Sequence, residues 1–313
     1  MRVDGLEKYV VLGCGYLGFH LAQYFNLLKN EVIVVGRTSY YTGKLHSAIQ
    51  FYEADLFDID SYKALLTVDC IVIHAVNHIN ATNSFADLDK DVKYNYLSFI
   101  RLINTCEEIN IKKFVFLSSA GTIYGNSTLD LIDESQPIAP VNIYGLQKVY
   151  FEKLLQIKML ESENFPYVSL RISNPYGGDQ DPKKKQGIIP ILIRKAFSGD
   201  DFELWANRKT TRDFIYIDDL LKATGDIIQS HFISGEEINI GSGQGTSLEE
   251  LIIFIEKSTG KKIKVVGKAV STTAIQSNVL DISKMVKLVG FKPEISIKEG
   301  IDRIVHQMKR ILL

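Results

Sequence analysis

Tyr144 and Lys148 are two side chains whose types and spacing could move a proton. They lie four residues apart at the start of a helical run, so both would be on one face of the helix. A phenol with a pKa of about 10 is a poor base at neutral pH, but a neighbouring ammonium stabilises the phenolate and lowers that pKa. We therefore expect Tyr144 to exchange a proton at a reaction centre, with Lys148 as its partner.

The spacing alone does not identify a reaction centre, because Tyr40 and Lys44 repeat it in a predicted loop. Only Tyr144 comes after a predicted strand that runs into the residues SSAGT. The hydroxyls of Ser119 and Thr122 could bind a substrate oxygen there, or they could merely cap the strand end. Sequence context therefore favours Tyr144 over Tyr40.

A glycine-rich loop begins where the first predicted strand, Tyr9 to Leu12, ends. Gly13, Gly15 and Gly18 form a GxGxxG pattern that opens a helix near Leu17. Such glycines allow a tight turn, close approach of the backbone to a pyrophosphate, and close packing of the helix, whose N-terminus faces the anion. The pattern in this strand-turn-helix context predicts a dinucleotide site.

The end of the second predicted strand should decide between the two nicotinamide dinucleotides. An acidic residue there would bind a free ribose diol, and a basic residue would bind a 2′-phosphate. This chain has Arg37, which could hold the phosphate with two hydrogen bonds and so favours NADP over NAD. Arg37 could also be an ordinary surface arginine. Asp55 and Leu56, after the third strand, fall where such folds contact adenine.

Short apolar runs alternate with amphipathic stretches through the first half of the chain, as in a parallel sheet covered by helices on both faces. The pattern predicts an α/β fold with a Rossmann-like, doubly wound parallel sheet. The expected strands are 9–12, 31–35, 49–53, 70–74, 114–117 and 167–171, with helices at 17–28, 59–66, 85–109 and 144–161.

The rhythm changes after about residue 175, where a lysine-rich loop (181–186) and a helix near 188–197 begin. We expect an NAD(P)-binding domain over residues 1–175 and a smaller C-terminal α/β lobe over 176–313 that binds the substrate. A segment near 212–240 could return to the first domain.

Composition excludes several other classes of protein. Lys and Arg number 36 and Asp and Glu 37, for a net charge of −1, and no segment concentrates positive charge as a nucleic-acid binder would. No window suggests a signal peptide or a membrane span, so we expect a cytoplasmic protein. The three scattered cysteines indicate small buried side chains. Cys70, His74 and His78 would share a face only on a helix, whereas a strand is expected there, so no metal site is predicted.

Six motifs in order carry a resemblance to a known family: VLGCGYLG, LSSAGTIYG, ESQPIAPVNIYGLQK, LRISNPYG, RDFIYIDD and NIGSGQGTSLEEL. They resemble the extended short-chain dehydrogenases, which include UDP-galactose 4-epimerase and other nucleotide-sugar epimerases, dehydratases and reductases. The resemblance covers nearly the whole chain. It implies a Rossmann-like domain, a small C-terminal lobe that holds a nucleoside diphosphate sugar, and a homodimer formed through the helices at 85–109 and 144–161.

The resemblance also implies roles for individual residues. Asn174 would contact the nucleotide sugar, and Arg212 would reach its diphosphate or base. Ser173 and Pro175 would line the nicotinamide pocket, and Asn95 would support the active-site helix beside the cofactor. The remaining implied cofactor contacts, beyond those named above, are Tyr16 and Leu17 of the glycine loop together with Tyr144 and Lys148.

The chain departs from the family at positions that matter for the chemistry. The usual catalytic serine or threonine is replaced by Ala120, so substrate contact would shift to Ser119 or Thr122. Gly121 and Thr122 stand where dehydratases have an Asp-Glu pair, which disfavours dehydration. Leu12 replaces a first glycine.

Three functions remain open. The first is epimerisation at C4 of a nucleoside diphosphate sugar, in which a hydride leaves the sugar and returns to its other face. The second is reduction of a 4-keto nucleotide sugar by NADPH, which Arg37 favours. The third is a non-catalytic regulator that binds a dinucleotide, which would tolerate Ala120. The motif set as a whole favours the epimerase.

Overall fold

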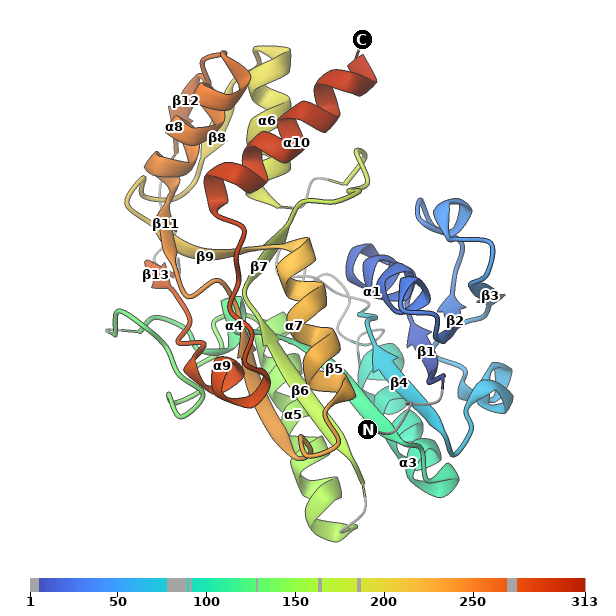
Figure 1. Cartoon of the computed structure of the whole chain (residues 1–313). Helices are drawn as coiled ribbons and strands as arrows, with labels where there is room; N and C mark the ends of the chain where they lie inside the picture. The colour runs from blue at the N-terminus through green and yellow to red at the C-terminus, as the bar shows by residue number, and fades with distance from the viewer. Residues whose placement is uncertain are drawn as a thin grey trace. The chain divides into compact units, whose positions relative to one another are not determined.

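The largest sheet of the chain has seven strands in the order β10-β6-β5-β4-β1-β2-β3 (Figure 1). The computed structural model describes residues 6–77, 89, 92–127, 129–162, 165–184, 187–268 and 275–312. Its strands are β1 (Lys8–Leu12), β2 (Glu31–Gly36), β3 (Gln50–Glu53), β4 (Cys70–His74), β5 (Lys113–Ser119), β6 (Tyr167–Ile172) and β10 (Glu236–Ile240).

Strand order changes direction at β1, which lies between β2 and β4. The pairs β1–β2, β2–β3, β1–β4 and β4–β5 are parallel, so these five strands all end at one edge of the sheet. A crevice at such a switch point is where open α/β sheets bind ligands. The predicted doubly wound fold is confirmed.

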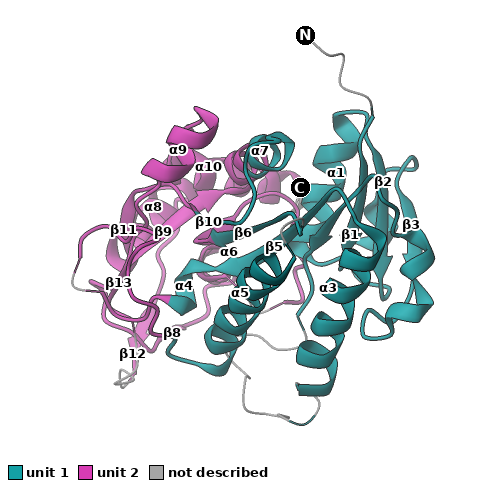
Figure 2. Ribbon diagram, turned by 90° about the horizontal axis from the view of Figure 1, so that it is seen from below, with its two compact units in different colours: residues 1–123, 140–171, 224–238 teal, residues 124–139, 172–223, 239–313 magenta. Residues whose placement is uncertain are grey.

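Helices cover both faces of this sheet. Figure 2 shows α1 (Tyr16–Leu27) on one face and α3 (Ser98–Ile109) beside α5 (Ile143–Glu161) on the other. This cover explains why every residue of β4 and β6 is buried. The edge strand β3 differs from our expectation, because none of its four residues is buried, and continuous apolar burial was wrong there.

Two predicted helices differ from the structure. The segment expected as one helix over 59–66 forms two short 3₁₀ turns, Ile59–Ser61 and Lys63–Leu65. The start of the helix expected over 85–109 lies largely outside the described residues. Its described part runs through a π-helical segment, Val92–Leu97, into α3. The active-site helix expected from residue 144 begins one residue earlier.

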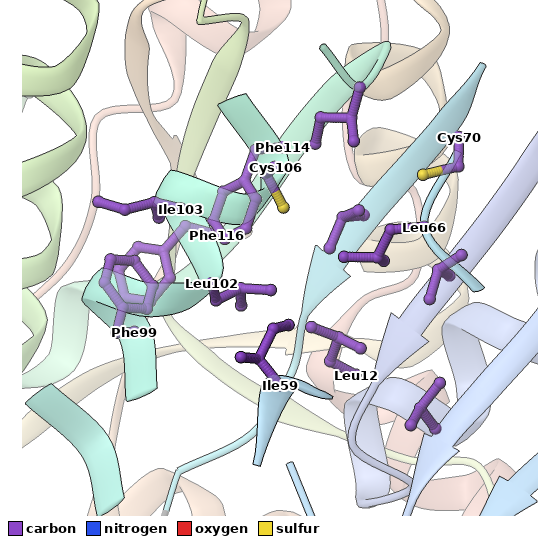
Figure 3. Close-up of a cluster of buried hydrophobic side chains, with 14 of the residues drawn as sticks. Leu12, Ile59, Leu66, Cys70, Phe99, Leu102, Ile103, Cys106, Phe114 and Phe116 are labelled. Atoms are coloured by element: carbon purple, nitrogen blue, oxygen red, sulfur yellow. The ribbon is translucent and has the colours of Figure 1, made fainter. Parts of the chain in front are cut away.

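Aromatic side chains fill the core between the sheet and the helices α3 and α5. Phe99 of α3 stacks on Phe151 of α5 with ring centroids 4.1 Å apart, and both rings lie near Phe116 of β5. Figure 3 shows Phe99, Phe114 and Phe116 with the neighbouring aliphatic side chains. The carboxyl end of β5 therefore packs against a dense cluster of aromatic side chains.

The chain divides into two compact units, coloured separately in Figure 2. The first contains residues 1–123, 140–171 and 224–238, and the second contains 124–139, 172–223 and 239–313. The remaining strands are β7 (Asn174–Tyr176), β8 (Phe202–Leu204), β9 (Thr211–Tyr216), β11 (Gly245–Ser247), β12 (Val265–Gly267) and β13 (Ser277–Asn278). The remaining helices are α4 (Ala120–Ile123), α6 (Ile188–Ser198), α7 (Ile217–Gln229), α8 (Leu248–Thr259), α9 (Ser283–Val289) and α10 (Ile297–Leu312). Within the described residues, no helix is both long enough and apolar enough to cross a membrane.

Candidate active site

The glycine loop joins β1 to α1, and its three glycines have different surroundings. Gly13 has a φ of +107°, and a Cβ built on Gly18 would lie 1.9 Å from the Gly13 carbonyl oxygen. Gly15 is the N-cap of α1, and a Cβ built there would have no atom within 4 Å. Two glycines thus permit the turn and its packing, whereas Gly15 leaves open space at a helix N-terminus, where an anion is stabilised.

A cavity of about 200 Å³ adjoins this loop. Its walls come from the carboxyl ends of β1, β2 and β4 and from the turn after β3, around the switch point of the sheet. The lining includes five residues that the sequence assigned to a dinucleotide, namely Gly13, Gly15, Arg37, Asp55 and Leu56. Tyr16, Leu17 and Gly18 lie in the first turn of α1 and are not among the lining residues.

Arg37 places a positive charge at this cavity, and Glu53 places a negative charge beside the same strand end. Arg37 lines the cavity, is exposed, and has no ion-pair partner in the described part of the chain. Glu53 is paired in register with Gly36, and its Oε1 accepts a hydrogen bond of 2.8 Å from the hydroxyl of Thr38. The guanidinium is therefore available to an anion, and a carboxylate is held close to the same strand end.

Helix α5 begins with a cap that fixes the position of Tyr144. The Asn142 side chain accepts a hydrogen bond of 2.7 Å from the Gly145 backbone N–H. A Cβ built on Gly145 would lie 2.5 Å from the Thr122 carbonyl oxygen, so this glycine lets the helix approach α4 closely. Tyr144 is thus brought next to the residues that follow β5.

Burial controls the acidity of the Tyr144 phenol. Desolvation raises its pKa to about 12, and a hydrogen bond with the Ser119 side chain acts in the opposite direction. The expected net lowering of this pKa is not found, because the cost of desolvating the phenolate is the largest effect on it. Tyr144 is therefore a protonated phenol at neutral pH.

Lys148 lies one turn further along α5 and is 4% exposed. Its ammonium donates a hydrogen bond of 2.8 Å to the Leu117 carbonyl and lies 4.7 Å from the centre of the Phe116 ring and 5.5 Å from that of Tyr144. Burial lowers the pKa of Lys148 to about 7, although the negative charge of Glu152 raises it. Lys148 can therefore change its charge near neutral pH.

A buried ion pair lies behind this lysine. Glu152, which is fully buried, accepts a hydrogen bond of 2.8 Å from Nη2 of Arg171 and one of 2.5 Å from the Ser118 hydroxyl. The Arg171 Nε also lies 3.2 Å from Oε2 of Glu152. The carboxylate is held on two sides.

His74 occupies the carboxyl end of β4 and is surrounded by aromatic rings. Burial, and secondly the positive charge of Lys148, lower the pKa of His74 to about 3, so its imidazole is neutral. A cavity of about 10 Å³, roughly the space of one water molecule, separates it from Asn95. Asn95 is buried on the π-helical segment, and Leu56 lines the same small cavity.

The competing pair, Tyr40 and Lys44, lies in the loop after β2. The Lys44 ammonium donates a hydrogen bond of 2.5 Å to the Tyr40 hydroxyl and lies 3.9 Å from the centre of its ring. This contact is exposed to solvent, unlike that of Tyr144 and Lys148. The two pairs thus share a spacing but not an environment.

The residues after β5 differ in how they could replace the hydroxyl missing at Ala120. Ala120 is fully buried. The Ser119 side chain contacts the Tyr144 phenol, whereas the Thr122 hydroxyl donates a hydrogen bond of 3.4 Å to the Ser119 carbonyl. Of the two candidates, the geometry favours Ser119.

The second unit gathers four of the assigned residues along β7 and β9. Ser173 donates to the Asp213 carboxylate, and Nδ2 of Asn174 donates a hydrogen bond of 2.8 Å to the Asp213 carbonyl. Pro175 is paired in register with Ile215 of β9. Arg212 donates hydrogen bonds to the backbone carbonyls of Thr211 and Ile275, which fix its guanidinium.

No metal cluster occurs within the described residues. Cys70 and His74 lie on a strand, as expected, and His78 lies outside the described residues. All three cysteines are buried and unpaired in disulfides, which confirms their prediction as small core residues.

Residues 9–241 match the model of the NAD dependent epimerase/dehydratase family. The chain belongs to this family. The match spans the glycine loop, Tyr144 and Lys148, and most of the large sheet. The predicted family is therefore confirmed. Its members are enzymes with a Rossmann-like fold.

This epimerase/dehydratase family member is similar to proteins of more than one activity. It is 33% identical to a putative UDP-glucose 4-epimerase of Methanocaldococcus jannaschii over 95% of the chain and 96% of that protein. It is 32% identical to a dTDP-4-dehydro-6-deoxyglucose reductase of Escherichia coli over 76% of the chain and 74% of that protein. A solved UDP-glucuronic acid 4-epimerase of Bacillus cereus, in complex with UDP-glucuronic acid and NAD, has a TM-score of 0.87 and 26% identity, with 97% of this chain and 99% of that chain covered.

Sequence reasoning missed several residues of this family member's site. Glu53 comes beside the end of β2 only through the register of β3 against β2, which no local pattern reveals. Glu152 continues the four-residue spacing of Tyr144 and Lys148, and Arg171 is a charge within a fully buried strand. The signal available in the sequence was that Glu152 and Arg171 both fall at positions expected to be buried, where charged residues are usually paired.

Proposed function

We propose that the chain is a nucleotide-sugar 4-epimerase in which Tyr144 exchanges the proton of the sugar hydroxyl. The observation that carries this proposal is the arrangement of buried Lys148 with half-buried Tyr144 and Ser119 at the carboxyl end of β5, two strands from the glycine loop of β1. The similarity to 4-epimerases over nearly the whole chain supports it.

The cavity at the switch point fits a nicotinamide dinucleotide. The open space at Gly15 and the N-terminus of α1 suit a pyrophosphate, and Asp55 and Leu56 would border the adenine. Tyr16, Leu17 and Gly18 would shape the loop, and Asn95 the neighbouring wall. We propose that Arg37, which is exposed at the wall of this cavity, would meet a 2′-phosphate, which favours NADP.

The residues of this site supply acid-base chemistry and positioning. When bound, the oxidised nicotinamide supplies the hydride acceptor and a positive charge that adds to that of Lys148. Two positive charges would lower the pKa of the Tyr144 phenol from its value in the free chain, so that it can take the hydroxyl proton and later return it. Ser119 would hold the reacting sugar oxygen beside the phenol, a role that Ala120 cannot fill.

We propose that the second unit binds the nucleotide and the sugar. Asn174 and Ser173 are held by Asp213, and Pro175 follows Asn174 in the short strand β7. Arg212 uses two of its five N–H groups on backbone carbonyls, which leaves further donors for a diphosphate.

Tyr144→Phe tests the proposal directly. We expect this variant to lose epimerase activity by at least about 100-fold, the usual contribution of a general acid-base group, while it still binds cofactor. The matched control is Tyr40→Phe, which removes the same hydroxyl from the exposed pair and should leave activity unchanged. Activity is measured across UDP-, dTDP-, GDP- and CDP-sugars. Full activity of Tyr144→Phe would exclude this mechanism, and no activity in wild type on any sugar would favour a dinucleotide-binding regulator.

The second candidate is an NADPH-dependent reductase of 4-keto nucleotide sugars. Arg37 and the similarity to a dTDP-4-dehydro-6-deoxyglucose reductase favour it. An epimerase returns its hydride to the sugar and consumes no reductant, whereas a reductase must exchange its cofactor at every turnover. The cofactor found with the purified protein therefore separates the two: a tightly retained dinucleotide, NAD above all, supports the epimerase, and freely exchanging NADP supports the reductase.

We also propose a homodimer. Exposed apolar side chains follow one stripe of α5, where Leu146 is 49%, Ile157 50% and Leu160 83% exposed. A stripe of this kind on a helix indicates a surface that another chain covers.

A further inference from the structure

Glu152 is the acidic residue whose negative charge acts on Lys148, and its carboxylate is shielded from solvent. It is fully buried, and its side chain in the ion pair with Arg171 is 1% exposed. It lies one helical turn after Lys148 on α5, so the two side chains share a helix face. The interaction of a buried carboxylate with a buried ammonium on the same helix face is screened much less by water and salt than that of an exposed pair.

Ser118 connects the same carboxylate to the strand that holds the lysine. Its hydroxyl donates to Glu152 Oε1, and the carbonyl of the preceding residue, Leu117, accepts the hydrogen bond of Lys148. Arg171 donates from Nε and Nη2, so its planar fork fixes the orientation of the carboxylate. The ammonium and the carboxylate are thus attached to adjacent residues of β5.

The other charged and titratable groups near Lys148 do not replace Glu152. His74 of β4 is neutral, and the Tyr144 phenol is protonated at neutral pH. Arg171 of β6 is positive, so its charge could only disfavour the ammonium form of Lys148. Without Glu152, a lysine removed from water would therefore be a neutral amine over most of the physiological range.

We propose that Glu152 is a positioning residue that increases the fraction of Lys148 present as an ammonium beside Tyr144 at neutral pH, with its carboxylate held in place by Arg171 and Ser118. The ammonium state is what the acid-base role of Tyr144 requires, so the catalytic meaning of this proposal rests on the proposed function. The charge state of Lys148 itself does not depend on it.

The test measures the titration of Lys148 in the cofactor-free protein by NMR, with lysine labelled with ¹³C at Cε. The Lys148 signal is assigned by its loss in Lys148→Met. In wild type its midpoint should lie near pH 7. In Glu152→Gln, the midpoint should fall by about 1 pH unit or more, the usual effect of one adjacent opposite charge. Glu152→Asp, which keeps the charge, should restore a midpoint close to wild type.

Glu161→Gln is the matched control, because it makes the same change at an exposed position of the same helix and should leave the midpoint unchanged. Where loss of the carboxylate beside Arg171 prevents folding of Glu152→Gln, the double variant Glu152→Gln/Arg171→Gln removes both charges of the ion pair, and its Lys148 should still titrate below wild type. An unchanged midpoint in a folded variant, with only a lower melting temperature, would overturn the proposal and leave Glu152 a structural residue.

The outcome is distinguishable from failure of the proposed function. A shifted midpoint together with wild-type protein that epimerises no nucleotide sugar would retain the role of Glu152 and reject the epimerase. Where wild type is active, the alkaline limb of the kcat/KM profile should move to lower pH in Glu152→Gln and not in Glu161→Gln.

Discussion

Two tyrosine-lysine pairs with the same spacing occur in this chain, and only their environments differ. Lys44 and Tyr40 meet in solvent, whereas Lys148 is buried among Phe116, Tyr144 and the end of β5. Burial brings the pKa of Lys148 into the neutral range, where a small change in local charge alters its protonation. At the scale of residues, function here depends on desolvation as much as on residue type.

Arg37 carries a prediction at the same scale. A charge-assisted contact with a 2′-phosphate is worth about 1.5–3 kcal/mol, or roughly 10- to 100-fold in Kd. We expect Arg37→Ala to weaken NADP by this factor and to leave NAD nearly unchanged, as measured by titration calorimetry. Arg101→Ala removes an exposed arginine from α3 and is the control. Equal weakening of both cofactors, or of neither, would show that Arg37 does not bind the phosphate.

The sequence could supply those site residues whose chemistry is local. The glycine loop and the pair Tyr144 and Lys148 were identified because their spacing along the chain sets their geometry. Glu53 and Arg171 could not be found this way, because a register and a cross-sheet contact bring them into place. The lowering of the Tyr144 pKa was predicted wrongly, because burial is a property of the fold and not of the spacing.

At the scale of elements, the switch point between β1, β2 and β4 positions the cavity, and the capped start of α5 positions the acid-base pair. The buried parallel strands were predictable because their apolar runs are continuous. The segment 59–66 was not, since an apolar pattern that suits a helix also suits the two short turns that pack Ile59 and Leu66 inward.

Two glycines of the loop between β1 and α1 should affect different properties, one the stability of the fold and the other the affinity for the cofactor. Gly18→Ala places a methyl group against the Gly13 carbonyl and should destabilise the fold by about 1–3 kcal/mol, as overpacking does. Gly15→Ala places the same methyl group in open space, so the free energy of unfolding should change little while cofactor affinity falls. Urea denaturation and cofactor titration of both variants measure the two effects. Equal losses of stability would contradict this division.

At the scale of the whole molecule, the apolar stripe of α5 predicts the assembly state. We expect wild type to sediment as a dimer, and the double variant Leu146→Asp/Ile157→Asp as a monomer, because charges cannot be buried in an apolar interface without large cost. Leu27→Asp on α1 changes an apolar side chain that is 74% exposed outside the stripe, and should stay dimeric. Monomeric wild type in sedimentation equilibrium would reject the dimer.

The interleaving of the two units has a consequence for biosynthesis. The chain passes between the units after residues 123, 139, 171, 223 and 238, and the first unit takes its last segment from 224–238. Part of β10, the outermost strand beside β6, belongs to that segment. Although domains usually fold in turn as they leave the ribosome, this one cannot complete its sheet until residue 240, the end of β10, has emerged. The cofactor site is therefore translated early, but its supporting sheet is finished late.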